Sequence, residues 1–337
     1  MDEANMSMEI KDMSGWLVVY GMRTSLKVAA IMMVGSIYKR NWHDLYRIDM
    51  SDRTETVSEL KKLSTVYPCH PDQENCVRHE PSELIQVFSL SLPKTPVNSV
   101  SIQLYGYMAA RDDMDGKLNY VFNRSRDDPL ILQQGLEFVQ SLCKLLEICI
   151  STYGLLEMTG PKRGIVMISD VLFEFDMKVR IGEKEEDDIQ LIDGVILRAI
   201  LMATHTVTHR ISGNCGGAVD ISLALVESGV EAIIEVIISE VQSAFDLSFS
   251  SFLSEWEFKE SHLFNGTIGE MCVERFVVAV LMDSMMPLKF KAGQKGPDSD
   301  VVHDCPFNAK VHGCTNRQIK LEQACISVNV NWSPPFF

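Results

Sequence analysis

The sequence lacks the features that mark nucleic-acid-binding and membrane-spanning proteins. It contains no Lys/Arg-rich run, and its 46 acidic residues against 31 basic ones give a net charge of −15. Because a surface this acidic repels phosphate backbones, we expect no nucleic-acid partner. The longest uncharged apolar piece near the N-terminus, Val28 to Tyr38, is shorter than the roughly 20 residues of a membrane-spanning helix, so we expect no transmembrane segment. A buried or amphipathic helix is the preferred interpretation, with a membrane-surface anchor as the alternative.

A secretory signal is also missing, because the chain opens with the acidic stretch MDEANMSMEIKD instead of a basic one. The nine cysteines are an odd number, which leaves at least one thiol unpaired. Cys143 and Cys149 lie in apolar stretches of the sequence, where a cysteine behaves as a small hydrophobic residue. We therefore expect a reduced intracellular protein in the cytoplasm.

The short motifs of common catalytic sites are absent as well. There is no G-x-S-x-G elbow, no phosphate loop and no G-x-G-x-x-G fingerprint. Cys215 lies beside glycines in GNCGGAVD, but no base for a nucleophilic thiol is identifiable nearby, so a Gly-rich turn is preferred. The stretch TGPKRG, Thr159 to Gly164, gives only weak support for a phosphate-binding loop. Its Gly and Pro predict a tight turn, with Lys162 and Arg163 exposed beside it.

What the sequence does contain is a hydrophobic period of two from about Pro81 onward. In FEFDMKVRIG, apolar residues from Phe173 to Ile181 alternate with charged ones, which is typical of a strand with one buried and one wet face. VFSLSL, VSIQLYG, VEAIIEVIISEV and CISVNVNW alternate similarly, and the continuous apolar run RFVVAVLMDS predicts a central strand. With Gly, Pro, Asn and Asp clusters between them, these strands predict a mainly β fold, an antiparallel β-sandwich over residues 81–332.

Some regions depart from this pattern. Residues 1–80 are predicted to form an irregular, partly helical N-terminal region. Between Leu130 and Tyr153 apolar residues recur at helical spacing and Gly154 follows as a stop signal, which predicts one inserted helix. The segment DGVILRAILMATHTVTH is compatible with a helix or a strand. The acidic run at residues 182–188 predicts a solvated hairpin loop.

The stretch YGYMAARDDMDGKLNYVFNR holds the main candidate site. Asp-Gly between two strand-like runs predicts a hairpin turn. Asp112, Asp113 and Asp115 also bring three carboxylates within four residues, and such hard oxygen ligands bind Ca²⁺. Their spacing does not match the helix-flanked calcium loop, which needs a later Glu. We therefore prefer a simple turn, and keep a metal site that docks the protein on membranes through Ca²⁺ as an alternative hypothesis.

Two further groups have side chains of metal-ligand type. Cys69, His70, Cys76 and His79 suit zinc, but their spacing matches no strong zinc pattern, and a Cys69–Cys76 disulfide is the alternative under oxidising conditions. The histidines of HTVTH, at 205 and 209, share a face on either a helix or a strand, so their spacing does not discriminate. Ordinary histidines are preferred there, and we expect no cofactor.

Four stretches together resemble a known family: HDLYRIDMSD, IQLYGYMAARDDMDGKLNYVFNRSRDD, MTGPKRGIVMISDVLFEFDMKVRIGEKEEDD and VEAIIEVIISEV. From about His43 to Trp332 the sequence resembles a plant family, expanded in cereals, that is known as a domain of unknown function. The resemblance implies a plant protein and a β-sandwich, and supplies no activity and no active-site residues. The first forty residues and the long stretch from Leu130 to Tyr153 depart from the family pattern, as insertions or products of an unspliced gene model would.

Some proteins with this domain resemble fusions to a ribosome-inactivating N-glycosidase, whose chemistry needs a Glu-x-x-Arg pair on a helix. No Glu of this sequence is followed by Arg at the third position, and Glu274 and Arg275 are adjacent. The expected function is therefore a non-catalytic accessory or interaction module in stress or defence, with an unknown protein partner. Ribosomal RNA N-glycosidase activity is the alternative.

Overall fold

The computed structural model describes residues 52–57, 80–97, 99–112, 114, 116–133, 154–167, 170–199, 206–253, 259–293 and 301–333. In these residues the regular elements are strands, apart from one short 3-10 turn, η1 (Glu185–Asp187). All pairs between strands are antiparallel. The prediction of a mainly β, antiparallel fold is therefore confirmed. No helix of the described part is long and apolar enough to cross a membrane.

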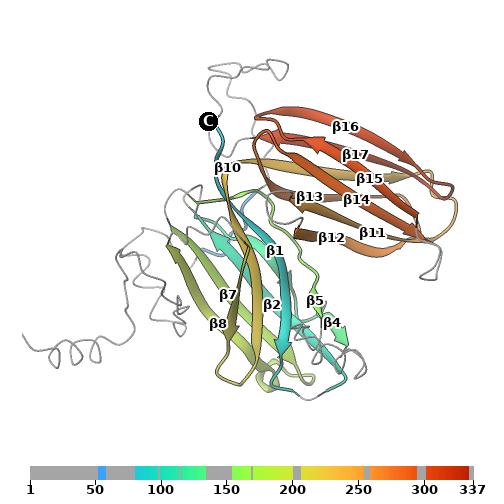
Figure 1. The fold of residues 1–337 in the computed structure, drawn as a ribbon. Helices are drawn as coiled ribbons and strands as arrows, with labels where there is room; N and C mark the ends of the chain where they lie inside the picture. The colour runs from blue at the N-terminus through green and yellow to red at the C-terminus, as the bar shows by residue number, and fades with distance from the viewer. Residues whose placement is uncertain are drawn as a thin grey trace, which may run out of the picture.

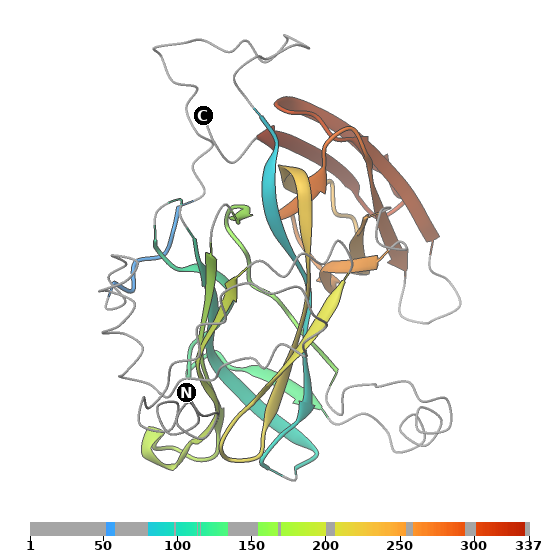
Figure 2. The same ribbon diagram turned by 60° about the vertical axis from the view of Figure 1, so that its left-hand side comes forward.

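The strands form three sheets (Figures 1 and 2). A five-stranded sheet has the order β3 (Asn119–Arg124), β2 (Ser101–Arg111), β7 (Asp170–Arg180), β8 (Ile189–Ala199), with β4 (Leu130–Gln133) on β2. A four-stranded sheet has the order β12 (Lys259–Ile268), β11 (Phe245–Leu253), β14 (Met285–Gly293), β15 (Val301–Asn308). An eight-stranded sheet has the path β16 (Gly313–Lys320), β17 (Cys325–Ser333), β10 (Ala218–Ser239), β1 (Ser82–Lys94), β5 (Leu155–Leu156), with β6 (Ile165–Val166) on β1 and both β9 (Val207–Ser212) and β13 (Cys272–Leu281) on β10.

The 22-residue strand β10 divides the molecule into two lobes. Its first half pairs with β1 and β9, and its second half pairs with β13 and β17. Between the halves Ser228 has a φ of 53°, a left-handed conformation that is uncommon for a residue other than Gly. We call β1 to β9 with residues 218–229 the first lobe, and residues 230–239 with β11 to β17 the second lobe. Figure 1 shows β10 leading from one lobe into the other.

Each lobe has a hydrophobic core, and Phe88 and Ala224 of the first lobe pack into the core of the second. In the first lobe, Phe173, Phe175, Met177 and Val179 of β7 are all buried in one cluster, so their predicted alternation is confirmed. Ile181 is 48% exposed, because β7 ends one residue before it. The alternation thus predicts the apolar face of β7 correctly, but it misses the end of the strand and the burial of Glu174 on the face expected to be wet.

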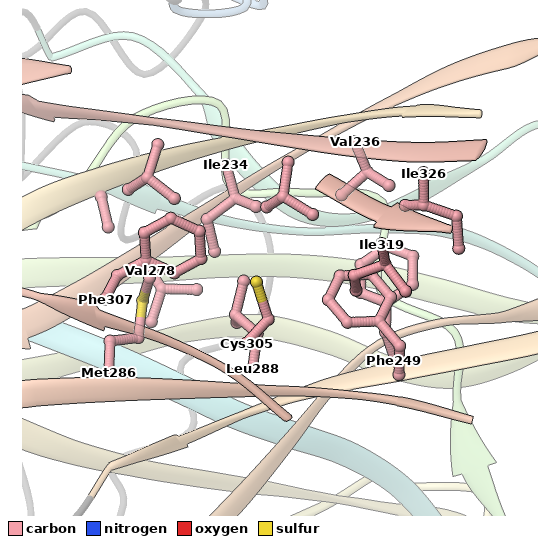
Figure 3. Packing of buried hydrophobic residues seen from close by; sticks show 14 of the residues in the cluster. Ile234, Val236, Phe249, Val278, Met286, Leu288, Cys305, Phe307, Ile319 and Ile326 are labelled. Carbon is pink, nitrogen blue, oxygen red and sulfur yellow. The ribbon is translucent and has the colours of Figure 1, made fainter. Parts of the chain in front are cut away.

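The second lobe has a core rich in phenylalanine, part of which Figure 3 shows. The ring of Phe249 lies 5.5, 5.0 and 5.1 Å from the rings of Phe264, Phe276 and Phe290. Ile234 of β10 points into the same cluster from the opposite sheet. Fully burying a side chain of this size stabilises a fold by about 1.5–3 kcal/mol.

The predicted inserted helix is not supported where it is described. Leu130–Gln133 form β4, which pairs with β2 from Ser101 to Leu104, because a neighbouring strand edge satisfies their backbone groups better than an isolated helical turn. Residues 134–153 lie outside the described part. The helical N-terminal region is not supported either: residues 52–57 are extended, and the other residues before 80 are not described. The ambiguous DGVILR stretch is strand β8.

The prediction that RFVVAVLMDS forms a central strand is wrong. In the described part β13 pairs only with β10. Its continuous apolar run has another cause: Val278 and Val280 face the second-lobe core, while Ala279 packs against Leu84 from the first lobe. The outward N–H of Ala279 donates to Oε1 of the buried Gln86 side chain at 2.8 Å. An edge strand is thus apolar on both faces because the two lobes meet there.

Candidate functional site

The predicted turn between β2 and β3 is confirmed, since the two strands form an antiparallel hairpin. Gly116 in this turn has a φ of 62°, which only Gly adopts at little cost. The turn is nevertheless more than a solvated bend, because Asp112 is only 2% exposed and points into the molecule. Asp113 and Asp115 lie outside the described residues.

Four donors surround the Asp112 carboxylate. Arg163 donates from both terminal nitrogens, with 2.7 Å from Nη2 to Oδ1 and 2.7 Å from Nη1 to Oδ2. The backbone N–H groups of Met114 and Val166 donate at 3.1 and 2.8 Å. Because a bidentate guanidinium is a strong partner for a carboxylate, a cation at Asp112 would have to displace Arg163. The described residues contain no group of three or more potential metal ligands. Calcium binding by Asp112, Asp113 and Asp115 stays a prediction.

The expected exposure of Arg163 is wrong, because its side chain is only 11% exposed. The turn that contains Arg163 is hydrogen-bonded to Asn119 of β3. Nδ2 of Asn119 donates to the carbonyl of Arg163 at 2.8 Å, and the N–H of Lys162 donates to Oδ1 of Asn119 at 2.9 Å. The N–H of Gly164 donates to the carboxylate of Glu231, which lies on β10 just after Ser228. The TGPKRG turn therefore connects the hairpin to the strand that both lobes share.

A second carboxylate, Glu174 of β7, has no exposed surface. Its Oε2 accepts from Nε of Arg111 at 3.0 Å, and its Oε1 accepts from the hydroxyl of Tyr107 at 2.7 Å and from Nη1 of Arg53 at 2.7 Å. Burial, and then the hydrogen bond to Glu174, raise the pKa of Tyr107 well above its usual range. We call Asp112, Arg163, Glu174 and Arg111 the charge cluster.

A third carboxylate, that of Asp188, lies in the acidic loop between β7 and β8. Residues 181–187 are exposed, as predicted, but the Asp188 side chain is fully buried. It accepts from Nε of Arg126 at 2.7 Å and from the Tyr105 hydroxyl at 2.6 Å. The hydrogen bond from Arg126 holds the pKa of Asp188 well below its usual range, and burial with the Asp188 contact raises the pKa of Tyr105. Asp188 thus ties the β3–β4 turn to the β7–β8 loop.

The ion pairs of these residues join parts of the chain that lie far apart in the sequence. Asp112 and Arg163 are 51 positions apart, and Glu174 and Arg111 are 63 apart, so each pair joins segments that are distant in sequence. Sequence reasoning missed the pairs because nothing in one sequence marks two distant residues as partners. One signal was present: Arg111 and Glu174 both lie within strand patterns, where a charged residue on a covered face requires a partner.

The other predicted sites give mixed results. Cys215 is exposed in the turn before β10, so the preferred interpretation as a Gly-rich turn is confirmed. His209 lies on strand β9, whereas His205 and the proposed zinc ligands Cys69, His70, Cys76 and His79 lie outside the described residues. Glu274 and Arg275 lie on strand β13, where adjacent side chains point to opposite faces.

A Ser–His contact that sequence reasoning did not consider lies on the second lobe. The hydroxyl of Ser250 and Nδ1 of His262 are 3.2 Å apart, and Oε1 of Glu260 lies 3.7 Å from the same nitrogen. In a catalytic triad the serine and the acid contact opposite nitrogens of the imidazole. Because both groups approach Nδ1 here, the arrangement is not a triad.

The outer face of β16, β17, β10 and β13 in the second lobe carries several exposed amide and hydroxyl side chains, together with one acidic and one basic side chain. Register places Asn316 beside Asn329, and Asn329 beside Glu235. Nδ2 of Asn329 donates to Oε2 of Glu235 at 3.3 Å, which confirms that the two side chains share this face. We call the following set the amide face: Asn316, Gln318, Ser327, Asn329, Asn331, Glu235 and Arg275. All seven are partly or fully exposed, so they can contact another molecule.

The fold and these clusters define a two-lobed antiparallel β protein whose buried charges hold its turns. The chain belongs to the family described as Domain of unknown function (DUF6598), whose model matches residues 84–330. No curated protein matches the chain. Similar solved structures include human GIVD cytosolic phospholipase A2, at 9% identity over 77% of this chain and 33% of that chain with a TM-score of 0.24. They also include the two calcium-bound C2 domains of Extended-Synaptotagmin 2, at 8% identity over 76% of this chain and 97% of that chain with a TM-score of 0.27. The chain spans about a third of the phospholipase, and similarities this low carry no functional argument.

Proposed function

We propose that this chain is a non-catalytic interaction module that binds a protein partner through the amide face. The observation that carries the proposal is that the carboxylates of its most specific sequence motifs are saturated by donors from within the chain. Asp112 accepts four hydrogen bonds, Glu174 three and Asp188 four. Carboxylates held in this way are neither free bases nor open metal ligands. Their role is to hold the sheets and turns that position an interaction surface.

The amide face has suitable chemistry for such a surface. Asn and Gln each offer donors and an acceptor without a net charge, and Ser offers both on one hydroxyl. Side chains of this kind form adaptable hydrogen bonds in binding surfaces. In a chain with a net charge of −15, a largely uncharged face also avoids the long-range repulsion that the rest of the surface imposes on acidic partners.

The biological setting of the proposal rests on the resemblance of the sequence motifs to a cereal-expanded plant family. From that resemblance we propose a plant protein that acts in stress or defence, in the cytoplasm, beside or fused to ribosome-inactivating proteins.

The rival activity, adenine release from ribosomal RNA, is tested directly with the purified full-length chain and plant ribosomes. We expect no depurination above that of a heat-denatured sample. Adenine release that a single substitution abolishes would overturn the non-catalytic proposal.

The surface itself is tested by site-specific photocrosslinking in plant extract. A photoreactive residue replaces Asn329 at the centre of the amide face, and the matched control carries it at Asn265, which is exposed on β12 of the same lobe. We expect Asn329 to give discrete protein adducts that the Asn265 variant lacks. Identical adduct patterns from both positions would contradict a partner surface at the amide face.

A further inference from the structure

Residues 52–57 lie against the first lobe as an extended segment. The N–H of Thr56 donates to the carbonyl of Leu118 at 2.9 Å, and the N–H of Leu118 donates to the carbonyl of Thr54 at 3.0 Å. Glu55 and Leu118 form an isolated parallel bridge. This is how an extended peptide adds to the edge of a sheet, with main-chain hydrogen bonds supplying affinity.

Side chains of the segment fill separate positions on the lobe. Arg53 places its guanidinium carbon 5.1 Å from the centre of the Tyr107 ring and donates to the Tyr107 hydroxyl and, at 2.7 Å, to Glu174. An aromatic face beside a buried carboxylate is a good receptor for a guanidinium. Arg53 is nevertheless 46% exposed, so it enters the position from outside.

Other residues of the segment also contact the first lobe. Nζ of Lys162 contacts Oε2 of Glu55 at 2.6 Å, and Nε of Arg163 donates to the Thr56 hydroxyl at 3.1 Å. Nη2 of Arg111 donates to the carbonyl of Asp52 at 2.7 Å. Arg53 and Glu55, two positions apart, thus each pair with a side chain of opposite charge, Glu174 and Lys162.

The receptor is complete without its occupant. Glu174 keeps Arg111 and Tyr107 as donors, and Arg163 keeps Asp112, when the segment is taken away. The receptor residues also lie within residues 84–330, which the family model matches, whereas residues 52–57 lie outside that range. The site and the segment that fills it therefore come from different parts of the chain.

We propose that this surface is a peptide-binding site for an extended segment with arginine followed two residues later by glutamate, and that residues 52–57 occupy it in cis. It is a second site, separate from the amide face. A tethered segment competes at a high effective concentration, so a ligand from outside binds well only when the tethered segment is weakened.

The test uses the full-length chain and a fluorescent hexapeptide with the sequence of residues 52–57, DRTETV. By fluorescence anisotropy we expect the peptide to bind the Arg53→Ala chain at least tenfold more tightly than the wild-type chain, because the cis segment of the variant has lost its anchor. A peptide with alanine in place of arginine should bind the same variant at least tenfold more weakly. Adding Lys162→Ala to the Arg53→Ala chain should also weaken binding, because it removes the partner of Glu55.

Circular dichroism and the unfolding midpoint establish that each variant is folded. Failure of the folded Arg53→Ala chain to bind the peptide, or equal binding of the arginine and alanine peptides, would overturn the proposal. Light scattering of wild-type chain mixed with the Arg53→Ala chain then tests whether the segment also binds in trans. A mixed dimer would show that the segment of one copy also fills the site of another, and a mixture that stays monomeric would show that the segment fills the site only in cis.

Discussion

The two lobes share strand β10 but are stabilised by different interactions. Among the described residues, the buried charged side chains are Arg111, Asp112, Glu174 and Asp188 in the first lobe, and Glu231 just beyond Ser228. The buried polar residues of the rest of the second lobe are serines, at 250, 251 and 261, around a core rich in phenylalanine. One lobe thus combines an apolar core with directional ion pairs, and the other relies on packing.

This difference follows from the kinds of segment that each lobe keeps in place. The first lobe contains turns and short strands, such as the TGPKRG turn, that bury few apolar groups of their own. Ion pairs and hydrogen bonds have fixed geometry, so they can hold such a turn in one position. The second lobe consists of long hairpins whose alternating side chains already specify the pairing. A hydrophobic contact has no direction, and it suffices where the strands themselves supply the register.

The largest expected effect comes from removing one partner of the buried ion pair. Glu174→Leu leaves Arg111 buried without its carboxylate, and we expect a loss of about 3–5 kcal/mol in the free energy of unfolding. Urea denaturation measures it. The control is the double variant Arg111→Met with Glu174→Leu, which we expect to recover most of the loss because it leaves no fully buried charge without a partner. A double variant as unstable as the single one would show that Glu174 acts through contacts other than Arg111.

A smaller effect is expected from the matching change in the second lobe. Ile234→Val removes one buried methylene from the core, and we expect a loss of about 0.5–1.5 kcal/mol. The same urea experiment in low and high salt separates the lobes: the cost of Ile234→Val should be independent of salt, since no charge is involved. A salt-dependent cost would contradict a second lobe held by packing alone.

The next effect is confined to acid pH. Because the pKa of Asp188 is lower in the folded chain than the value of about 3.9 in an unfolded one, its ion pair stabilises the fold above that pH. This contribution is lost as the pH falls through the folded pKa. We expect Asp188→Asn to flatten the decline of the unfolding midpoint below pH 4. Asp187→Asn, in the same loop but exposed, should leave the decline unchanged.

The smallest effect concerns calcium. Since all four hydrogen-bonding positions of Asp112 are taken by Arg163 and two backbone N–H groups, we expect millimolar Ca²⁺ to leave the thermal unfolding midpoint unchanged. Liposome sedimentation with and without Ca²⁺ should likewise show no difference. A rise in the midpoint that Asp112→Asn removes would instead support the calcium hypothesis for Asp112, Asp113 and Asp115.

Strand content was predictable wherever alternation was long and clean, as in β7, β10 and β17. The inserted helix was mispredicted at its start because Leu130–Gln133 are short enough to suit either period, and only pairing with β2 decides between them. The central position of β13 was mispredicted for a related reason. A continuous apolar run indicates that both faces of a strand are buried. It does not show whether the strand has neighbours on both edges, as a central strand does, or lies at an edge where two lobes meet.

The candidate site was predictable only in part. The hairpin turn and the exposed acidic loop follow from local residues, namely Asp-Gly between strands and a run of like charges. The burial of Asp112, Arg163 and Asp188 does not, because each depends on a partner or a covering segment more than fifty positions away.

The amino-acid sequence was enough to establish that this chain forms antiparallel strands with one apolar face, because side-chain alternation is a local property of two neighbouring residues. It also led us to expect no nucleic-acid partner, from the net charge of −15. The division into two lobes, the charge cluster and the binding position of residues 52–57 could be identified only from the folded structure. Each of them depends on contacts between distant segments, and a contact of that kind exists only after the chain has closed on itself.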